Sequence, residues 1–207
     1  MGASVGLAAQ CRYHTRGISG RRAHTLCGKP RARRLSLKLT TIRVLGIDPG
    51  SQCTGFGLVD VAGPRLTYVA SGVIRTPHGD LAARLCEIFT CMRSIVSQYR
   101  PQEIAIERVF VNRNPDSALK LGQARGAAIC GTAEAGAEVF EYATREIKQA
   151  VVGSGSAEKA QVQLMMRSLL KLEGPVASDA ADALAAAVCH ALRGSVRASL
   201  RAAARLR

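Results

Sequence analysis

The stretch RVLGIDPGSQCTGFGLVDV, residues 43–61, decides the fold because it holds two strands and the turn between them. RVLGID (43–48) is a short apolar run that ends in an acid, and Pro49–Gly50 stops it, as expected of a buried strand. The β pattern resumes over 54–61 and again over 65–74 after a short turn. We expect these two segments to pair as antiparallel neighbours.

The rest of the chain alternates helices with strands. Leu81, Leu85, Ile88, Met92, Ile95 and Tyr99 form one apolar stripe at helical spacing, and Pro101 ends that helix. The patterns that follow predict strands over 103–110 and 138–142 and helices over 117–135, 144–152, 156–170 and 178–192, the last three capped by Thr144, Ser156 and Ser178. This order predicts an α/β fold with a five-stranded mixed β-sheet flanked by α-helices.

Two acids end predicted strands on faces lined by small residues. Asp48 shares a strand face with Gly46, and Glu107 shares one with Ala105. If the two strands are parallel neighbours, both carboxylates reach the same edge of the sheet. Each acid also has an ordinary structural interpretation, Asp48 as a turn former before Pro-Gly and Glu107 as an ion-pair partner.

Two further acids, Asp179 and Asp182, interrupt the alanine-rich helix three positions apart, which places them on one helix face. Acids are favoured in a first helical turn by the helix dipole, but that preference does not explain an acid on the face that would pack on a sheet. Four carboxylates gathered at one place repel one another unless cations lie between them. Oxygen ligands suit Mg²⁺ or Mn²⁺, and two such ions are a known device for phosphodiester hydrolysis.

The positive charge is concentrated at the N-terminus. The net charge is +14, and residues 1–41 contain nine Lys and Arg but no Asp or Glu. We expect residues 1–41 to be a disordered basic extension, and residues 42–207 to form the folded domain with a basic C-terminal tail. The extension can be dispensable or non-native sequence, an arm that contacts DNA, or an organelle transit peptide, and its composition does not separate these.

The cysteine pattern and the hydropathy narrow the class of protein. Seven cysteines at irregular spacing, without a CxxC pair, predict reduced core thiols of a cytosolic protein rather than a disulfide framework or a zinc site. No apolar run approaches the roughly 20 residues that span a bilayer. A basic body that keeps a few acids in special places fits a polyanionic partner such as nucleic acid, although simple solubility would also account for the charge.

Several motifs together resemble the RuvC family of Holliday-junction resolvases. They are VLGIDPGSQCTGFG (44–57), AIERVF (105–110), NPDSALKLGQARG (114–126), VFEYATREIKQAVVGSGSAEKAQVQ (139–163) and SDAADALA (178–185). The likeness runs almost continuously from about Arg43 to the basic C-terminus, and residues 1–41 fall outside it.

The resemblance implies an RNase H-like fold and a crossover junction endodeoxyribonuclease. By motif alignment the catalytic and metal-binding acids fall on Asp48, Glu107, Asp179 and Asp182. The family likeness further implies two Mg²⁺ ions per subunit, replaceable by Mn²⁺, and products with 5′-phosphate and 3′-hydroxyl ends. It also implies a four-way DNA junction as substrate, a homodimer that nicks it symmetrically, and work beside the RuvA–RuvB branch-migration complex in recombination and DNA repair.

Basic and aromatic residues within the matched motifs are candidates for DNA contacts. Lys148 and Lys159 lead, because they stand in the strongest part of the resemblance. Weaker candidates are Arg113, Lys120 and Arg125, and Phe110 could stack on an unpaired base or belong to the core. For any single Lys a solvated surface position remains the alternative.

Two other features have open interpretations. The stripe of small residues Ala118, Gly122, Gly126 and Cys130 can be a dimer contact or can pack on the protein's own sheet. We expect His190, two turns beyond Asp182 on the same helix, to be structural.

Other functions fit the sequence less well. Another RNase H-like nuclease that acts on RNA or on other branched nucleic acid could use the same acids. A sugar-kinase or actin-like ATPase would need a second domain and an adenosine loop, for which the chain is too short. A catalytically inactive DNA-binding module would have no need for all four acids.

Overall fold

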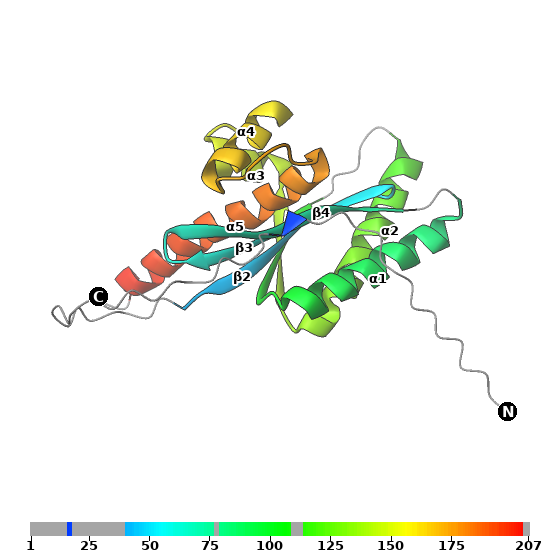
Figure 1. The fold of residues 1–207 in the computed structure, drawn as a ribbon, viewed down its shortest axis with the longest axis horizontal. Coiled ribbons are helices and arrows are strands. Elements are labelled where there is room, and N and C mark those ends of the chain that lie inside the picture. The colour runs from blue at the N-terminus through cyan, green and yellow to red at the C-terminus, as the bar shows by residue number, and fades with distance from the viewer. Residues whose placement is uncertain (1–15, 18–39, 77–78, 109–113, 205–207) are drawn as a thin grey trace.

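The computed structural model describes residues 16–17, 40–76, 79–108 and 114–204, and its strands form one mixed sheet (Figure 1). The sheet order is β1-β4-β3-β2-β5-β6. Its five long strands are β2 (Ile42–Asp48), β3 (Cys53–Ala62), β4 (Arg65–Arg75), β5 (Glu103–Arg108) and β6 (Glu138–Ala143), and they confirm the predicted set. Strand β3 pairs antiparallel with both β2 and β4. On the other side of β2, β5 pairs parallel with β2, and β6 pairs parallel with β5.

A sixth strand comes from the N-terminal extension, which we expected to be disordered. Strand β1 (Arg16–Gly17) has two residues and pairs antiparallel with the outer strand β4, opposite Ser71 and Ala70. The other residues of the extension up to 39 lie outside the described residues. Even this short pairing covers part of a strand that would otherwise be a sheet edge.

Helices cover both faces of the sheet (Figure 1). The helical elements are α1 (Leu81–Tyr99), α2 (Pro115–Thr132), the 3₁₀ turn η1 (Ala133–Ala135), α3 (Thr144–Val152), α4 (Lys159–Leu169) and α5 (Ser178–Ala204). Leu45 and Ile47 of β2 point to the side of α1 and α2, whereas Val44 points to the side of α5. Of the helices in the described part of the chain, none combines the length and apolar character that a bilayer crossing requires.

Helix α5 lies on the sheet at backbone contact distance. A Cβ placed on Gly46 of β2 would lie 1.9 Å from the carbonyl oxygen of Ala183, and one on Gly55 of β3 would lie 2.0 Å from that of Asp179. The alanines of α5 are correspondingly buried, Ala183 and Ala187 among them. The backbone of α5 therefore fills the space above Gly46 on the strand face that carries Asp48.

The structure corrects the predicted helix starts. Helix α3 has Ala143 as its N-cap, α4 has Glu158, and Ser178 already belongs to α5, so none of the three predicted hydroxyl caps is used as one. Instead Asn114 caps α2 by accepting hydrogen bonds from the backbone amides of Asp116 and Ser117. At its other end α5 continues past the predicted end at residue 192 into the basic tail.

Two smaller predictions are settled by burial. The described cysteines are free thiols, but Cys86 and Cys130 are exposed rather than in the core. A Cβ on Gly122 or Gly126 would meet nothing within 4 Å, so these positions of the small-residue stripe do not pack on the protein's own sheet. Close helix approach occurs instead at Gly131, beside the backbone of Phe89 in α1.

Candidate active site

Strands β2 and β5 bring the first two predicted acids together. The parallel register pairs Ile47 with Ile106, so Asp48 and Glu107 end neighbouring strands at the same edge of the sheet. This is the arrangement predicted from the strand patterns. Both acids lie on the face covered by α5.

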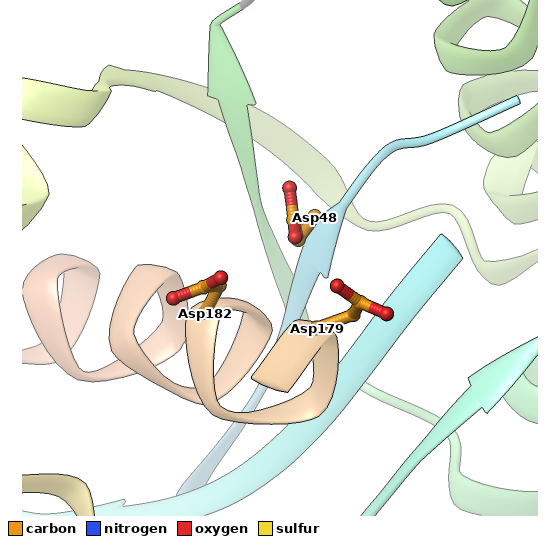
Figure 2. A group of neighbouring side chains, drawn as sticks. All are labelled: Asp48, Asp179 and Asp182. Atoms are coloured by element: carbon orange, nitrogen blue, oxygen red, sulfur yellow. The ribbon is translucent and has the colours of Figure 1, made fainter. Parts of the chain in front are cut away.

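Helix α5 adds the other two acids (Figure 2). Asp179 and Asp182 stand in its first turns and project toward the end of β2, where Asp48 lies. One carboxylate oxygen from each of Asp48, Asp179 and Asp182 lies within 4.8 Å of the others. Glu107 is outside this group of three, and its Oε1 accepts a hydrogen bond from the Thr144 hydroxyl.

Crowding raises the pKa of Asp48 to about 8. Burial is the largest cause, because it disfavours the charged form, and repulsion by Glu107, Asp182 and Asp179 adds to it. The nearby Lys159 acts in the opposite direction. A carboxyl whose pKa is shifted this far by burial and by neighbouring acids marks a candidate functional site.

Lys159, the first residue of α4, supplies the local positive charge. Its Nζ lies 2.8 Å from Oδ2 of Asp182, and this hydrogen bond is the main reason why the pKa of Lys159 is raised. The Lys159 side chain remains more than half exposed. Lys159, predicted as a phosphate contact, thus lies at the edge of the acid cluster itself.

The turn after Asp48 is fixed by side chains that the sequence reasoning did not single out. Arg84 of α1 donates to the carbonyl oxygen of Ser51 from Nε and Nη2, at 3.0 and 2.7 Å. The buried hydroxyl of Thr54 donates to the carbonyl oxygen of Gly50 at 2.8 Å. In the sequence, Arg84 could have been noticed only as a charged residue next to the apolar stripe that contains Leu81 and Ile88. These hydrogen bonds fix the backbone of Gly50 and Ser51, directly after Asp48.

The remaining DNA-contact candidates differ in their surroundings. The Lys120 ammonium lies 2.6 Å from Oδ2 of Asp116, and Nη2 of Arg125 lies 2.6 Å from Oε1 of Glu141. Each of these two basic side chains therefore already forms an ion pair within the chain. Lys148 lies on α3, near the site end of β6, and is half-buried. Phe110 and Arg113 lie outside the described residues.

His190 is structural, as expected. It is buried, its Nδ1 lies 2.7 Å from the hydroxyl of Tyr142, and its Nε2 lies 2.7 Å from Oε2 of Glu103. The Phe140 ring packs against the imidazole at a tilt of 40°, with 4.4 Å between ring centroids. This cluster fastens α5 to the start of β5, through Glu103, and to β6, through Tyr142.

The donor set fits divalent cations such as Mg²⁺. Carboxylate oxygens are hard ligands, three of them converge within 4.8 Å, and a fourth acid stands on the neighbouring strand. The raised pKa of Asp48 shows that Lys159 does not compensate the cluster fully. A metal ion placed among these groups would relieve the remaining repulsion.

Comparisons with known proteins agree with this arrangement. The family model described as crossover junction endodeoxyribonuclease RuvC matches residues 44–190. The RuvC of Burkholderia lata is 57% identical over 159 residues, which cover 77% of this chain and 88% of that protein.

Solved structures agree as well. The Thermus thermophilus RuvC structure has 36% identity and a TM-score of 0.68, and T. thermophilus RuvC in complex with a Holliday junction substrate has 35% identity and a TM-score of 0.70. Each alignment covers 75% of this chain and 96% of the Thermus chain. With its RNase H-like sheet and the acids at its edge, this chain belongs to the RuvC family of crossover junction endodeoxyribonucleases.

Proposed function

We propose that this chain resolves four-way DNA junctions by metal-dependent hydrolysis of phosphodiester bonds, in homologous recombination and DNA repair. The observation that carries the proposal is the convergence of Asp48, Asp179 and Asp182, with Glu107 at the end of the adjacent strand. The names of its relatives, and the Thermus relative solved with a Holliday junction, supply the substrate class.

In this proposal the four acids hold two Mg²⁺ ions, which Mn²⁺ can replace. Bound ions supply the Lewis acidity that activates water and stabilises the leaving 3′ oxygen, giving 5′-phosphate and 3′-hydroxyl ends. Asp48 is close enough to Glu107 and to both α5 acids to feel their charges, so the ions would be held around Asp48. Because Asp48 has a raised pKa, loading the site releases its proton, and loading becomes easier as the pH rises toward 8.

Basic side chains around the acids would hold the DNA backbone. Lys159 is placed to contact a phosphate while it pairs with Asp182, and Lys148 is the second leading candidate. Arg113 and Phe110 remain proposed from sequence only. Lys120 and Arg125 are weaker, because Asp116 and Glu141 already neutralise them.

The symmetry of a four-way junction calls for two active sites, so we propose a homodimer. The open positions Gly122 and Gly126 on α2 support a helix-to-helix contact, since close approach to α2 is sterically free there. We also propose that the enzyme works in the cytoplasm with RuvA–RuvB. Its catalytic unit would be residues 42–207, with residues 1–41 as an extension.

The test is cleavage of a synthetic four-way junction beside a linear duplex of the same sequence, each with Mg²⁺ and with EDTA. We expect symmetric nicks in the junction, only with Mg²⁺, that DNA ligase can reseal. Equal cutting of both substrates, or cutting in EDTA, would refute the proposal.

A variant separates chemistry from binding. Asp48→Asn keeps the shape of the side chain but loses the charge that holds a cation, so it should bind the junction and fail to cut it. Circular dichroism shows whether the variant is folded. A folded variant that still cuts at the wild-type rate would contradict the role given to Asp48.

A further inference from the structure

Thr144 contacts Glu107 from the neighbouring strand of the sheet. Parallel pairing of β5 with β6 sets Arg108 opposite Ala143, so the next residue, Thr144, lies beside the end of β5. Its hydroxyl donates a hydrogen bond to Oε1 of Glu107. The contact therefore links the first residue of α3 to one of the four acids.

The Thr144 hydroxyl is free for this contact because its own helix does not use it. The N-cap of α3 is Ala143, and the backbone amide of Ala143 donates to Oε2 of Glu146 at 2.9 Å. Threonine is favoured as an N-cap, but Thr144 lies one residue inside the helix. Here the helix end is closed by Glu146, and the hydroxyl faces the active site.

Glu107 needs such a contact more than the other acids do. Asp48, Asp179 and Asp182 have short side chains on packed elements, and their oxygens already converge. Glu107 has one more rotatable bond and stands outside that group. A carboxylate held through one oxygen keeps its second oxygen available and has fewer orientations to lose when a cation binds.

We propose that Thr144 is a positioning residue for Glu107, holding Oε1 so that Oε2 is directed at the metal site. This inference rests on the proposed function of the acids as metal ligands. It assigns Thr144 a role in metal affinity and none in direct contact with substrate.

The experiment compares Thr144→Val, which keeps the shape and removes the hydroxyl, with Thr144→Ser, which restores it. Thr67→Val is the matched control, because Thr67 is an exposed strand residue of β4 paired with Asp60, away from the acids. Mn²⁺ binding to the full chain without DNA is followed by electron paramagnetic resonance. The Mg²⁺ concentration that gives half-maximal junction cleavage is measured in parallel.

We expect Thr144→Val to bind Mn²⁺ about tenfold more weakly, at the lower end of the range for partners of metal ligands because Thr144 is exposed. Thr144→Ser should return to within about twofold of the wild type and Thr67→Val should match it, by the same reasoning. Cleavage at saturating Mg²⁺ should be retained, with only the half-maximal concentration raised.

The proposal is overturned if Thr144→Val binds Mn²⁺ as the wild type does, or if Thr144→Ser binds as weakly as Thr144→Val. Failure of the proposed function has a different signature. A wild type that binds Mn²⁺ but cuts no junction would refute junction cleavage and leave the role of Thr144 supported by the binding data.

Discussion

Asp48 makes the stability of the metal-free protein depend on pH. Its pKa rises from 3.8 to about 8 on folding, so the folded state binds a proton that the unfolded state has released. Protonated Asp48 thus favours the folded state. This contribution to the free energy of unfolding is fully present below pH 4 and is lost progressively as the pH rises through 8. Asp48→Asn has no carboxyl to ionise and escapes this loss.

The size of the effect follows from the pKa shift. Each pKa unit corresponds to about 1.4 kcal/mol, so a shift of about four units sets an upper bound near 6 kcal/mol. Relaxation and entry of water at a site with an exposed lysine reduce this to about 3 kcal/mol. For a domain of this size that difference corresponds to about 6–12 °C in Tm.

The assay is thermal unfolding in EDTA from pH 4.5 to 9, followed by circular dichroism. The Tm of Asp48→Asn should exceed that of the wild type by an amount that grows with pH and levels off above pH 8. Asp116→Asn, which changes an exposed acid paired with Lys120, should run parallel to the wild type. Parallel profiles for Asp48→Asn as well would refute the reasoning.

Saturating Mg²⁺ supplies a second arm of the same test. A ligand at 100 times its Kd stabilises the folded state by about 2.7 kcal/mol, so the wild type at pH 8 should gain Tm with Mg²⁺. The Tm of Asp48→Asn should rise little with Mg²⁺. The difference in Tm between the variant and the wild type should therefore shrink or change sign. A wild type that is insensitive to Mg²⁺ at pH 8 would contradict the assignment of the acids as ligands.

Two further predictions concern packing. Gly46→Ala forces a Cβ against the carbonyl oxygen of Ala183 and should destabilise the fold by about 3 kcal/mol or more. Gly122→Ala meets no neighbouring atom and should stabilise the monomer by up to about 1 kcal/mol. Urea unfolding of both variants checks this contrast, and equal unfolding midpoints would contradict it. His190→Leu removes the hydrogen bonds to Tyr142 and Glu103 and should destabilise by about 2 kcal/mol, while leaving the relative cleavage of junction and duplex unchanged at 25 °C.

Periodicity in the sequence predicted the five long strands and the edge at which Asp48 and Glu107 meet. The apolar stripe from Leu81 to Tyr99 corresponds to α1 without change. The face shared by Asp48 and Gly46 is the face on which α5 lies. Such patterns are local, and burial on one face enforces them, so they survive into the fold.

What the sequence did not predict depends on contacts between distant residues. Thr144 has the chemistry of a cap, yet its hydroxyl bonds Glu107, because Glu146 closes the helix. Lys159 was assigned to phosphate from its motif, and its pairing with Asp182 arises only once α4 is packed beside α5. Neither contact can be predicted from residue spacing within one helix or strand, since each depends on how two elements are placed relative to one another.

The packing of α5 explains how the fold tolerates repulsion among its acids. Helix α5 can deliver Asp179 and Asp182 to Asp48 because Gly46 and Gly55 let its backbone touch the strands. That contact buries a long row of alanines, and each residue removed from water contributes to holding the helix in place. The free energy that brings like charges together is therefore supplied along the helix, away from the charges. It follows that a cation favours the ionised form of Asp48 rather than assembling the site, so at neutral pH the folded protein should keep α5 in place after metal removal while Asp48 takes up a proton.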